Sequence, residues 1–268
     1  MVIGDILFEL NNVSFNYPSD ELVLRDISLI VHEGEKLCIL GANGCGKSTL
    51  LKLLAGLIYP VNGDFKAYGV AVSDKSFTNE EFARNYHKKT GFIFQNSDTQ
   101  LFCSTVMDEI AFGLLQLKLP FQEVEKRVED MLEMLDIRHL REKTPFKLSG
   151  GEKKKVALAC VLALNPMVLI LDEPTSGLDP RTQRSLVELL MQLSSAGKTI
   201  ITATHNLELV QEISDRAVVF DEHHGIAADS EISNVLGNTE LLKRVNLVDD
   251  YYHLHAGHKH SHYHIHNY

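Results

Sequence analysis

A glycine-rich turn between an apolar strand and a helix constrains this chain more than any other feature. Residues 41–48 read Gly-Ala-Asn-Gly-Cys-Gly-Lys-Ser, which fits the pattern G-x-x-x-x-G-K-[ST]. The preceding residues 36–40 have the apolar character of a buried strand, and residues 47–54 form a helical pattern closed by Gly56. A strand, a glycine-rich loop and a helix in this order predict an α/β sheet that binds phosphate groups on backbone N–H groups at the helix N-terminus.

Other apolar segments extend this unit into a sheet. Residues 168–171, 199–203 and 217–220 are short, continuous apolar runs typical of buried parallel strands, and residues 91–94 return to strand character. Residues 186–193 form a helical segment between two of these runs. Strands that alternate with helices predict a parallel sheet covered on both faces.

The remaining segments predict two further parts. Residues 7–16 and 22–31 suit an antiparallel edge sheet, and Thr78 with Glu81 has the spacing of a capping box that begins a short helix. From Val106 the pattern is helical, with one face formed by Val124, Val128, Met131, Leu132 and Leu135. After Asp221 we expect regular structure to weaken.

We therefore expect three parts. Residues 1–95 and 166–225 form the nucleotide-binding core with its antiparallel β part, residues 96–165 form an inserted helical part, and residues 226–268 form a C-terminal extension with a histidine-rich tail.

Composition excludes several classes of protein. The longest apolar runs fall well short of the roughly 20 residues that cross a bilayer, and the first ten residues do not resemble a signal peptide. The four cysteines form no CxxC pair, which fits a reducing compartment, so we expect the chain to stay in the cytoplasm. A formal charge of −10 disfavours nucleic acid as a partner, and we interpret the basic run at residues 153–155 as a solvated helix face.

A pair of carboxylates ends one of the predicted strands. Residues 168–173 read Val-Leu-Ile-Leu-Asp-Glu, which places Asp172 and Glu173 at the strand end, where open α/β sheets bind ligands. Alone, the pair would indicate an acidic turn before Pro174. Beside a phosphate loop, Asp172 can hold Mg²⁺ and Glu173 can accept a proton from an attacking water.

A second glycine pair begins a predicted helix. Ser149 and Glu152 have the spacing of a capping box, and Gly150 and Gly151 follow the cap. Taken singly, the segment indicates capping. The two glycines also leave backbone N–H groups bare, which is what an approaching phosphate needs.

The combination resembles the ATP-binding cassette (ABC) family from about Leu7 to Phe220. The loop at residues 41–48 is similar to the Walker A motif, the strand ending in Asp172 and Glu173 to Walker B, and residues 148–152 to the signature sequence. The shorter matches are Gln95 for the Q-loop, Asp179 in the D-loop at residues 176–179, His205 for the switch histidine, and Tyr17 for the aromatic residue that stacks on adenine.

The resemblance implies a P-loop NTPase cassette with a RecA-like parallel-sheet core, an antiparallel β subdomain and an inserted helical subdomain. It implies ATP hydrolysis with Glu173, His205 and Gln95 as catalytic residues, and Mg²⁺ held through Ser48, Gln95 and Asp172. The residues expected to contact ATP in the same chain are Tyr17, Gly41, Asn43, Gly44, Cys45, Gly46, Lys47, Ser48 and Thr49.

The resemblance also implies partners. In this family the signature of one subunit contacts the ATP on the phosphate loop of another, so Ser149, Gly150 and Gly151 are expected to act on the second subunit's nucleotide. Asp179 is expected to communicate across that dimer. Further partners are integral membrane transporter subunits, with this chain peripheral at the cytoplasmic face of the cell membrane.

One segment is similar to a particular subgroup of this family. Residues 94–102 read Phe-Gln-Asn-Ser-Asp-Thr-Gln-Leu-Phe, which is similar to ATPases of energy-coupling-factor (ECF) importers, where this stretch helps form the groove for a coupling helix. The segment departs from the usual pattern at Ser97 and Thr99.

The histidine-rich tail adds a hypothesis about the substrate. Its last five histidines recur at every second residue, and neutral imidazoles suit ions such as Ni²⁺ and Co²⁺. Tail and segment together favour a cobalt or nickel importer of the ECF type, with a second copy of the chain as the dimer partner. The tail histidines are His258, His260, His262, His264 and His266.

Several alternatives stay open. A vitamin importer of the ECF type, another ABC transporter, and a heterodimer with a similar ATPase all fit the same motifs. A cassette protein of translation or DNA repair usually carries tandem cassettes or a long coiled-coil insertion, and this chain has neither. A metal storage module would explain the tail but not the nucleotide motifs.

Overall fold

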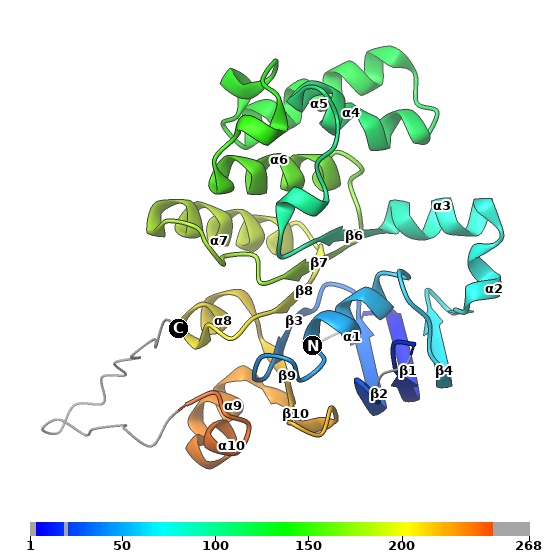
Figure 1. Cartoon of the computed structure of the whole chain (residues 1–268), viewed down its shortest axis with the longest axis vertical. Helices are drawn as coiled ribbons and strands as arrows, with labels where there is room; N and C mark the ends of the chain where they lie inside the picture. The colour runs from blue at the N-terminus through cyan, green and yellow to red at the C-terminus, as the bar shows by residue number, and fades with distance from the viewer. Residues whose placement is uncertain (1–3, 19–20, 249–268) are drawn as a thin grey trace, which may run out of the picture.

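The structure, a computed structural model, describes residues 4–18 and 21–248, which form two β-sheets and the helices around them. In Figure 1 helices α4, α5 and α6 gather at one end of the molecule, and α9 and α10 lie at the opposite end. The sheets lie between these two groups of helices.

The smaller sheet is antiparallel, with the strand order β2-β1-β4-β5. Its strands are β1 (Ile6–Phe15), β2 (Leu24–His32), β4 (Asn62–Ala67) and β5 (Val70–Ala71). Buried side chains of this sheet join the same core as helix α1 (Lys47–Leu54) and one face of the larger sheet. The antiparallel sheet that the first segments predict is confirmed.

The larger sheet has the order β10-β9-β3-β8-β7-β6. Val168 and Ile170 pack in the cluster that contains α1, whereas Leu169 and Leu171 pack in the cluster that contains α6 and α7, so helices cover both faces. Its parallel strands are β3 (Lys36–Leu40), β6 (Thr90–Ile93), β7 (Val168–Asp172), β8 (Thr199–Ala203) and β9 (Arg216–Phe220). The expected α/β class with a parallel core sheet is confirmed.

A group of helices separates β6 from β7 along the chain. Its members are η1 (Ser97–Thr99), α4 (Val106–Gln116), α5 (Phe121–Met134), η2 (Arg138–Leu140), η3 (Pro145–Lys147) and α6 (Gly150–Leu162). The predicted apolar face of α5 is buried against α4 and α6. The insertion therefore exists, while the boundaries assigned to the three parts of the chain stay a prediction.

The capping box expected at Thr78 is wrong. Thr78 ends helix α2 (Asp74–Phe77), where its hydroxyl donates to the carbonyl of Lys75. Helix α3 (Glu80–Lys89) is capped instead by Asn79, whose side-chain oxygen accepts from the backbone N–H groups of Glu81 and Phe82. One helix ends and the next begins within residues 77–80. Asn79 is a strong N-cap residue, and the capping-box spacing from Thr78 to Glu81 does not take it into account.

Regular structure continues after Asp221, which corrects the expected loss of order. After α7 (Pro180–Ser195) and α8 (Leu207–Ile213) come β10 (Ile226–Glu231), α9 (Ile232–Gly237) and α10 (Thr239–Arg244). Strand β10 pairs antiparallel with β9, and apolar residues of α9 and α10 pack against β3 and β9 in a third core cluster. These helices span less than two turns each, so their apolar residues show no sequence period.

Candidate active site

The register of the parallel strands collects the predicted site residues at one sheet edge. Ile39 pairs with Ala203, Asp172 pairs with the same Ala203, and Ile93 pairs with Leu171. The residues that follow β3, β6, β7 and β8 therefore leave the sheet at adjacent positions. These segments carry the phosphate loop, Gln95, Glu173 and His205, and the carboxyl edge is where open α/β sheets bind ligands.

Two glycines of the loop have backbone conformations and close neighbours that exclude residues with a Cβ atom. Gly46 has a φ of 111°, and a Cβ there would lie 2.5 Å from the carbonyl oxygen of Val23. Gly41 has a φ of 151°, and a Cβ there would lie 2.6 Å from Sγ of Cys45. Helix α1 begins after Gly46 with no side-chain cap, so its first N–H groups face the loop. The loop can bind an anion on its backbone.

The loop lysine is buried and turned into the loop. Lys47 Nζ donates to the carbonyl oxygens of Gly41 at 2.8 Å and Ala42 at 2.9 Å. Thr49 and Cys45 are also buried, and burial raises the pKa of the Cys45 thiol, so that side chain stays neutral and packs in the core. Asn43 and Gly44 are exposed at the tip of the loop.

Asp172 has the features of a cation ligand. The carboxyl is buried, burial raises its pKa, and the Ser48 hydroxyl forms a hydrogen bond with it that acts in the opposite direction. Its Oδ1 has no hydrogen-bond partner within the described residues. A buried carboxylate oxygen without a donor is costly, and a hard divalent cation such as Mg²⁺ satisfies it. The residues present therefore fit the ion that the sequence implies.

Glu173, Thr204 and His205 form one hydrogen-bonded group. Glu173 is buried, with Oε1 2.7 Å from Nδ1 of His205 and Oε2 3.1 Å from the hydroxyl of Thr204, which donates to it. Its backbone φ of 44° lies in the left-handed region that non-glycine residues seldom adopt. Strained backbone of this kind clusters at functional sites, where surrounding contacts hold it. The carboxylate is thus fixed in direction and can accept a proton.

Lys154, the middle residue of the basic run, contacts the segment that carries Gln95. Gln95 follows β6 and is exposed, and Lys154 Nζ donates to its carbonyl oxygen at 3.1 Å.

The interpretation of residues 153–155 as a solvated face is wrong for Lys154, which is 3% exposed. Burial lowers the pKa of Lys154 to about 8, although Asp172 and Glu173 act to raise it. Lys153 pairs with Asp98 at 2.5 Å, and Lys155 donates to the Leu135 carbonyl.

The signature residues lie on a separate cavity. The hydroxyl of Ser149 accepts from the N–H of Glu152, and the Glu152 carboxylate accepts from the N–H of Ser149, which confirms the predicted capping box. A cavity of about 470 Å³ is lined by Ser149, Gly150, Gly151, Asp179 and neighbouring residues. Asp179 also caps α7 through the N–H groups of Arg181 and Thr182. Residues 41–48 are not among the lining residues, so this cavity is not at the phosphate loop of the same chain. Helix α6 lies with α4 and α5, away from α1 (Figure 1).

Tyr17 lies just after β1 and is half-buried. Its ring meets Phe15 edge to face, with centroids 5.0 Å apart, and it packs against the core cluster that contains α1. Its stacking on adenine stays a prediction.

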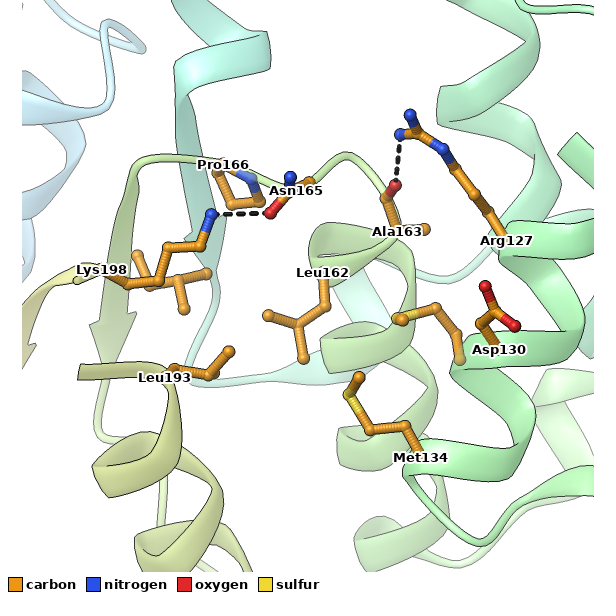
Figure 2. Close-up of a pocket in the computed structure, with 11 residues that line it drawn as sticks. Arg127, Asp130, Met134, Leu162, Ala163, Asn165, Pro166, Leu193 and Lys198 are labelled. Atoms are coloured by element: carbon orange, nitrogen blue, oxygen red, sulfur yellow. Dashed lines mark hydrogen bonds between the residues drawn. The ribbon is translucent and has the colours of Figure 1, made fainter. Parts of the chain in front are cut away.

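A second cavity, of about 310 Å³, lies away from these groups (Figure 2). It is lined by residues before β7 and β8, such as Pro166 and Lys198, and by α5 and the end of α6. Lys198 Nζ donates to Asn165 Oδ1, and Arg127 donates to the Ala163 carbonyl, as Figure 2 shows. This is the amino edge of the sheet, opposite to the site.

Two further expectations concern metal and membrane. The tail histidines from His258 to His266 lie outside the described residues. Within residues 4–18 and 21–248, His, Cys, Asp and Glu side chains form no group of three or more suited to a metal ion, and each helix is too short or too polar to cross a bilayer.

Sequence reasoning missed two residues of the site, Thr204 and Lys154. Thr204 is fully buried and holds Glu173. A signal was present, because Thr204 is a polar residue at the end of an apolar strand, directly before His205. Lys154 carried no comparable signal, since the direction of a helical side chain depends on the neighbouring segment.

The geometry agrees with comparisons to known proteins. The family model described as ABC transporter matches residues 24–176. An ABC transporter ATP-binding protein of Methanosarcina acetivorans is 51% identical, covering 93% of this chain and 92% of the relative. The nickel import ATP-binding protein NikO of Rhodobacter capsulatus is 43% identical, covering 90% and 95% respectively. The energy-coupling factor transporter ATP-binding protein EcfA of Methanothermobacter thermautotrophicus is 37% identical, covering 90% and 76%.

Solved structures share the architecture. The structure of cbiO1 from Clostridium perfringens, part of the ABC transporter complex cbiONQ, superimposes with a TM-score of 0.76 at 34% identity, covering 91% of this chain and 95% of that chain. The dimeric ATP-binding cassette MJ0796, in a post-hydrolysis state bound to ADP and Pi, has a TM-score of 0.76 at 27% identity, covering 84% and 99%.

Proposed function

Because the chain belongs to the ABC transporter family and is an ATP-hydrolysing subunit of that family, we propose that it works as a homodimer that energises a membrane importer of nickel or cobalt ions. The observation that carries the enzymatic part is the group formed by Asp172, Glu173 and His205 at the carboxyl ends of β7 and β8, beside the phosphate loop.

In this proposal Glu173 is the general base of hydrolysis. Its carboxylate accepts the proton of the attacking water, and the hydrogen bonds from Thr204 and His205 hold it in one orientation. His205 is 57% exposed in its side chain, so its ring can reach a γ-phosphate while Nδ1 stays on Glu173. The orientation of the base is then set before ATP binds.

The phosphate loop and the metal ligands position the substrate. Backbone N–H groups of the loop and of the first turn of α1 receive the phosphates, with Lys47 turning from the loop carbonyls to the phosphate oxygens. Asp172, Ser48 and Gln95 would hold Mg²⁺. When bound, the ion would neutralise charge on the phosphate oxygens.

Separation of the signature from the phosphate loop supports a dimer. One chain has one loop and one signature, and helix α6 lies apart from α1 in the fold (Figure 1). Two copies in antiparallel arrangement bring Ser149, Gly150 and Gly151 of each copy to the ATP of the other. The similar cassette MJ0796 is dimeric, which supports a dimer here as well.

An exposed apolar surface near the 94–102 segment supports a membrane partner. Phe102 is 60% exposed and Phe112 43% exposed, and their rings meet edge to face with centroids 5.0 Å apart. Leu115, on the same helix as Phe112, is also exposed. We propose that a coupling helix of a transmembrane subunit covers these side chains, with the ATPase peripheral at the cytoplasmic face of the membrane.

The nature of the relatives and of the tail supports a metal ion as the transported species. NikO is a nickel import ATP-binding protein, and neutral imidazoles of the tail suit Ni²⁺ and Co²⁺. The relative EcfA favours the ECF class as a whole, so a vitamin importer is the second candidate.

Copurification tests the proposal. The chain, isolated from native membranes in detergent, is expected to carry integral membrane subunits and bound nickel or cobalt detectable by elemental mass spectrometry. Recovery with a vitamin-binding membrane subunit would favour the second candidate, and recovery with ribosomes or DNA alone would refute a transport role. Deletion of residues 251–268 is expected to weaken Ni²⁺ or Co²⁺ binding in calorimetry without change in thermal unfolding.

A further inference from the structure

The first residues of α6 and its N-cap contact two regions: the cavity lined by residues 149–151 and the segment after β6. Ser149, Gly150 and Gly151 line the cavity that, in the proposed dimer, receives the ATP of the second copy. Lys154, three residues after Gly151, is buried and donates to carbonyl oxygens of the segment after β6 in its own chain. One short piece of helix therefore touches both the segment of one ATP site and the cavity of the other.

The contact of Lys154 is specific. Its Nζ lies 3.0 Å from the carbonyl oxygen of Phe94 and 3.1 Å from that of Gln95, so one ammonium binds two consecutive carbonyls. An ammonium has three donors and no acceptor, and a buried one is costly unless its donors are satisfied. Lys154 is 3% exposed, so in this fold the two carbonyls rather than solvent accept from its ammonium, and moving this segment away from α6 would remove both acceptors.

A second contact holds the same segment on the outside. Lys153 Nζ lies 2.5 Å from Asp98 Oδ1, and η1, which contains Asp98, contacts α6. The Asp98 side chain is 58% exposed, so this pair is worth little by itself. Lys154 therefore provides the stronger of the two attachments.

We propose that Lys154 is a positioning residue that ties Gln95 to the signature helix, so that closure of residues 149–151 on one ATP and placement of Gln95 at the other ATP occur together. The inference rests on the proposed dimer. From Ser149 to Lys154 the chain is a capped helix of roughly one and a half turns, which transmits displacement without bending. The two sites of the dimer are thereby coupled in free energy.

The test uses the full chain with Glu173→Gln, which is expected to hold the ATP-bound dimer. Lys154→Met is added to it, with Lys153→Met as the matched control, since that variant removes the same charge from the same turn. Lys154→Arg restores two donors for the two carbonyls. Binding of a fluorescent ATP analogue to the monomer and ATP-dependent dimerisation by light scattering are measured on each variant, together with thermal unfolding.

Lys154→Met is expected to leave the ATP affinity of the monomer nearly unchanged and to raise the ATP concentration for half-dimerisation at least about fivefold, the lower end of typical coupling between sites. Lys154→Arg should recover most of that change, and Lys153→Met should match the parent. Lys154→Gln, which removes the charge and shortens the side chain, gives a second variant with the same expected loss if the methionine variant does not fold.

Three results would overturn the inference. Dimerisation of the Lys154→Met variant within about twofold of the parent would show no coupling, and an equal loss of monomer ATP affinity would show a local effect on the site. A parent that binds ATP but stays monomeric with membrane subunits supplied would refute the proposed dimer itself, and the inference with it.

Discussion

Replacement of Glu173 by glutamine removes one chemical ability and little else. The two side chains have the same shape, and Glu173 uses its oxygens as acceptors from Thr204 and opposite Nδ1 of His205. A glutamine can keep both contacts, with its oxygen toward Thr204 and its amide N–H toward an imidazole nitrogen in the other tautomer. We therefore expect the free energy of unfolding to change by no more than about 1 kcal/mol.

The loss in hydrolysis should be far larger. General-base catalysis contributes about 100- to 10,000-fold, which corresponds to about 2.7 to 5.4 kcal/mol of activation free energy. Phosphate release at saturating ATP and Mg²⁺ measures the rate, and light scattering measures the dimer, which should outlive that of the unsubstituted chain because ATP persists. Turnover within about threefold of the unsubstituted chain would falsify the assignment of Glu173 as the base.

Glu109 provides a matched control. It is also buried, and its Oε2 accepts from the N–H groups of Phe102 at 2.8 Å and Cys103 at 2.6 Å, away from the sheet edge. Glu109→Gln weakens charge-assisted hydrogen bonds and is expected to lower stability by about 1–3 kcal/mol, while hydrolysis per folded molecule stays unchanged. The two variants thus separate loss of stability from loss of chemistry.

Three further changes test other parts of the site. Asp172→Asn should abolish Mg²⁺-dependent hydrolysis yet raise the thermal unfolding temperature at pH 7. Burial raises the pKa of Asp172 in the folded state above its usual 3.8, so the native state loses stability as pH rises through the raised pKa. The gain from asparagine should therefore vanish below about pH 4, where the carboxyl is protonated in the folded and the unfolded state. A variant less stable than the unsubstituted chain at pH 7 would contradict this. Gly46→Ala should cost about 1–3 kcal/mol and eliminate ATP binding, because of the φ of 111° and the close Val23 carbonyl, and normal nucleotide titration would count against it. Ser149→Ala should cost about 1 kcal/mol in urea unfolding through the lost cap, and an unchanged midpoint would argue against that role.

The residues whose place in the fold could be predicted lie in contiguous motifs on a regular backbone. A strand, a turn and a helix fix the positions of residues 41–48 among themselves, and a continuous apolar run fixes Asp172 and Glu173 at a strand end. Parallel pairing then brings the ends of β3, β7 and β8 together without further information. The α/β class and the grouping of these residues at one sheet edge follow from these local patterns.

What escaped prediction depends on contacts between distant segments. Thr204 matters because its hydroxyl lies beside Glu173, and nothing within the motif of either residue states that distance. The short helices α9 and α10 are stabilised by packing on β3 and β9 rather than by their own length. Such elements lack both a period and a motif, so only the folded chain reveals them.

The three adjacent lysines of α6 show that residues in a run of like charges can point in different directions and have different partners. Successive residues on a helix point about 100° apart, so Lys153 turns outward to Asp98, Lys154 inward to Phe94 and Gln95, and Lys155 to the Leu135 carbonyl. Cations near a helix N-terminus oppose its dipole, so each needs a compensating acceptor, and each has one. The acceptors lie on separate segments, and α6 is therefore anchored on several sides just beyond its first turn. Ser149 and Gly150 are exposed in the turn just before these contacts, which suits the contact with a second copy that we propose.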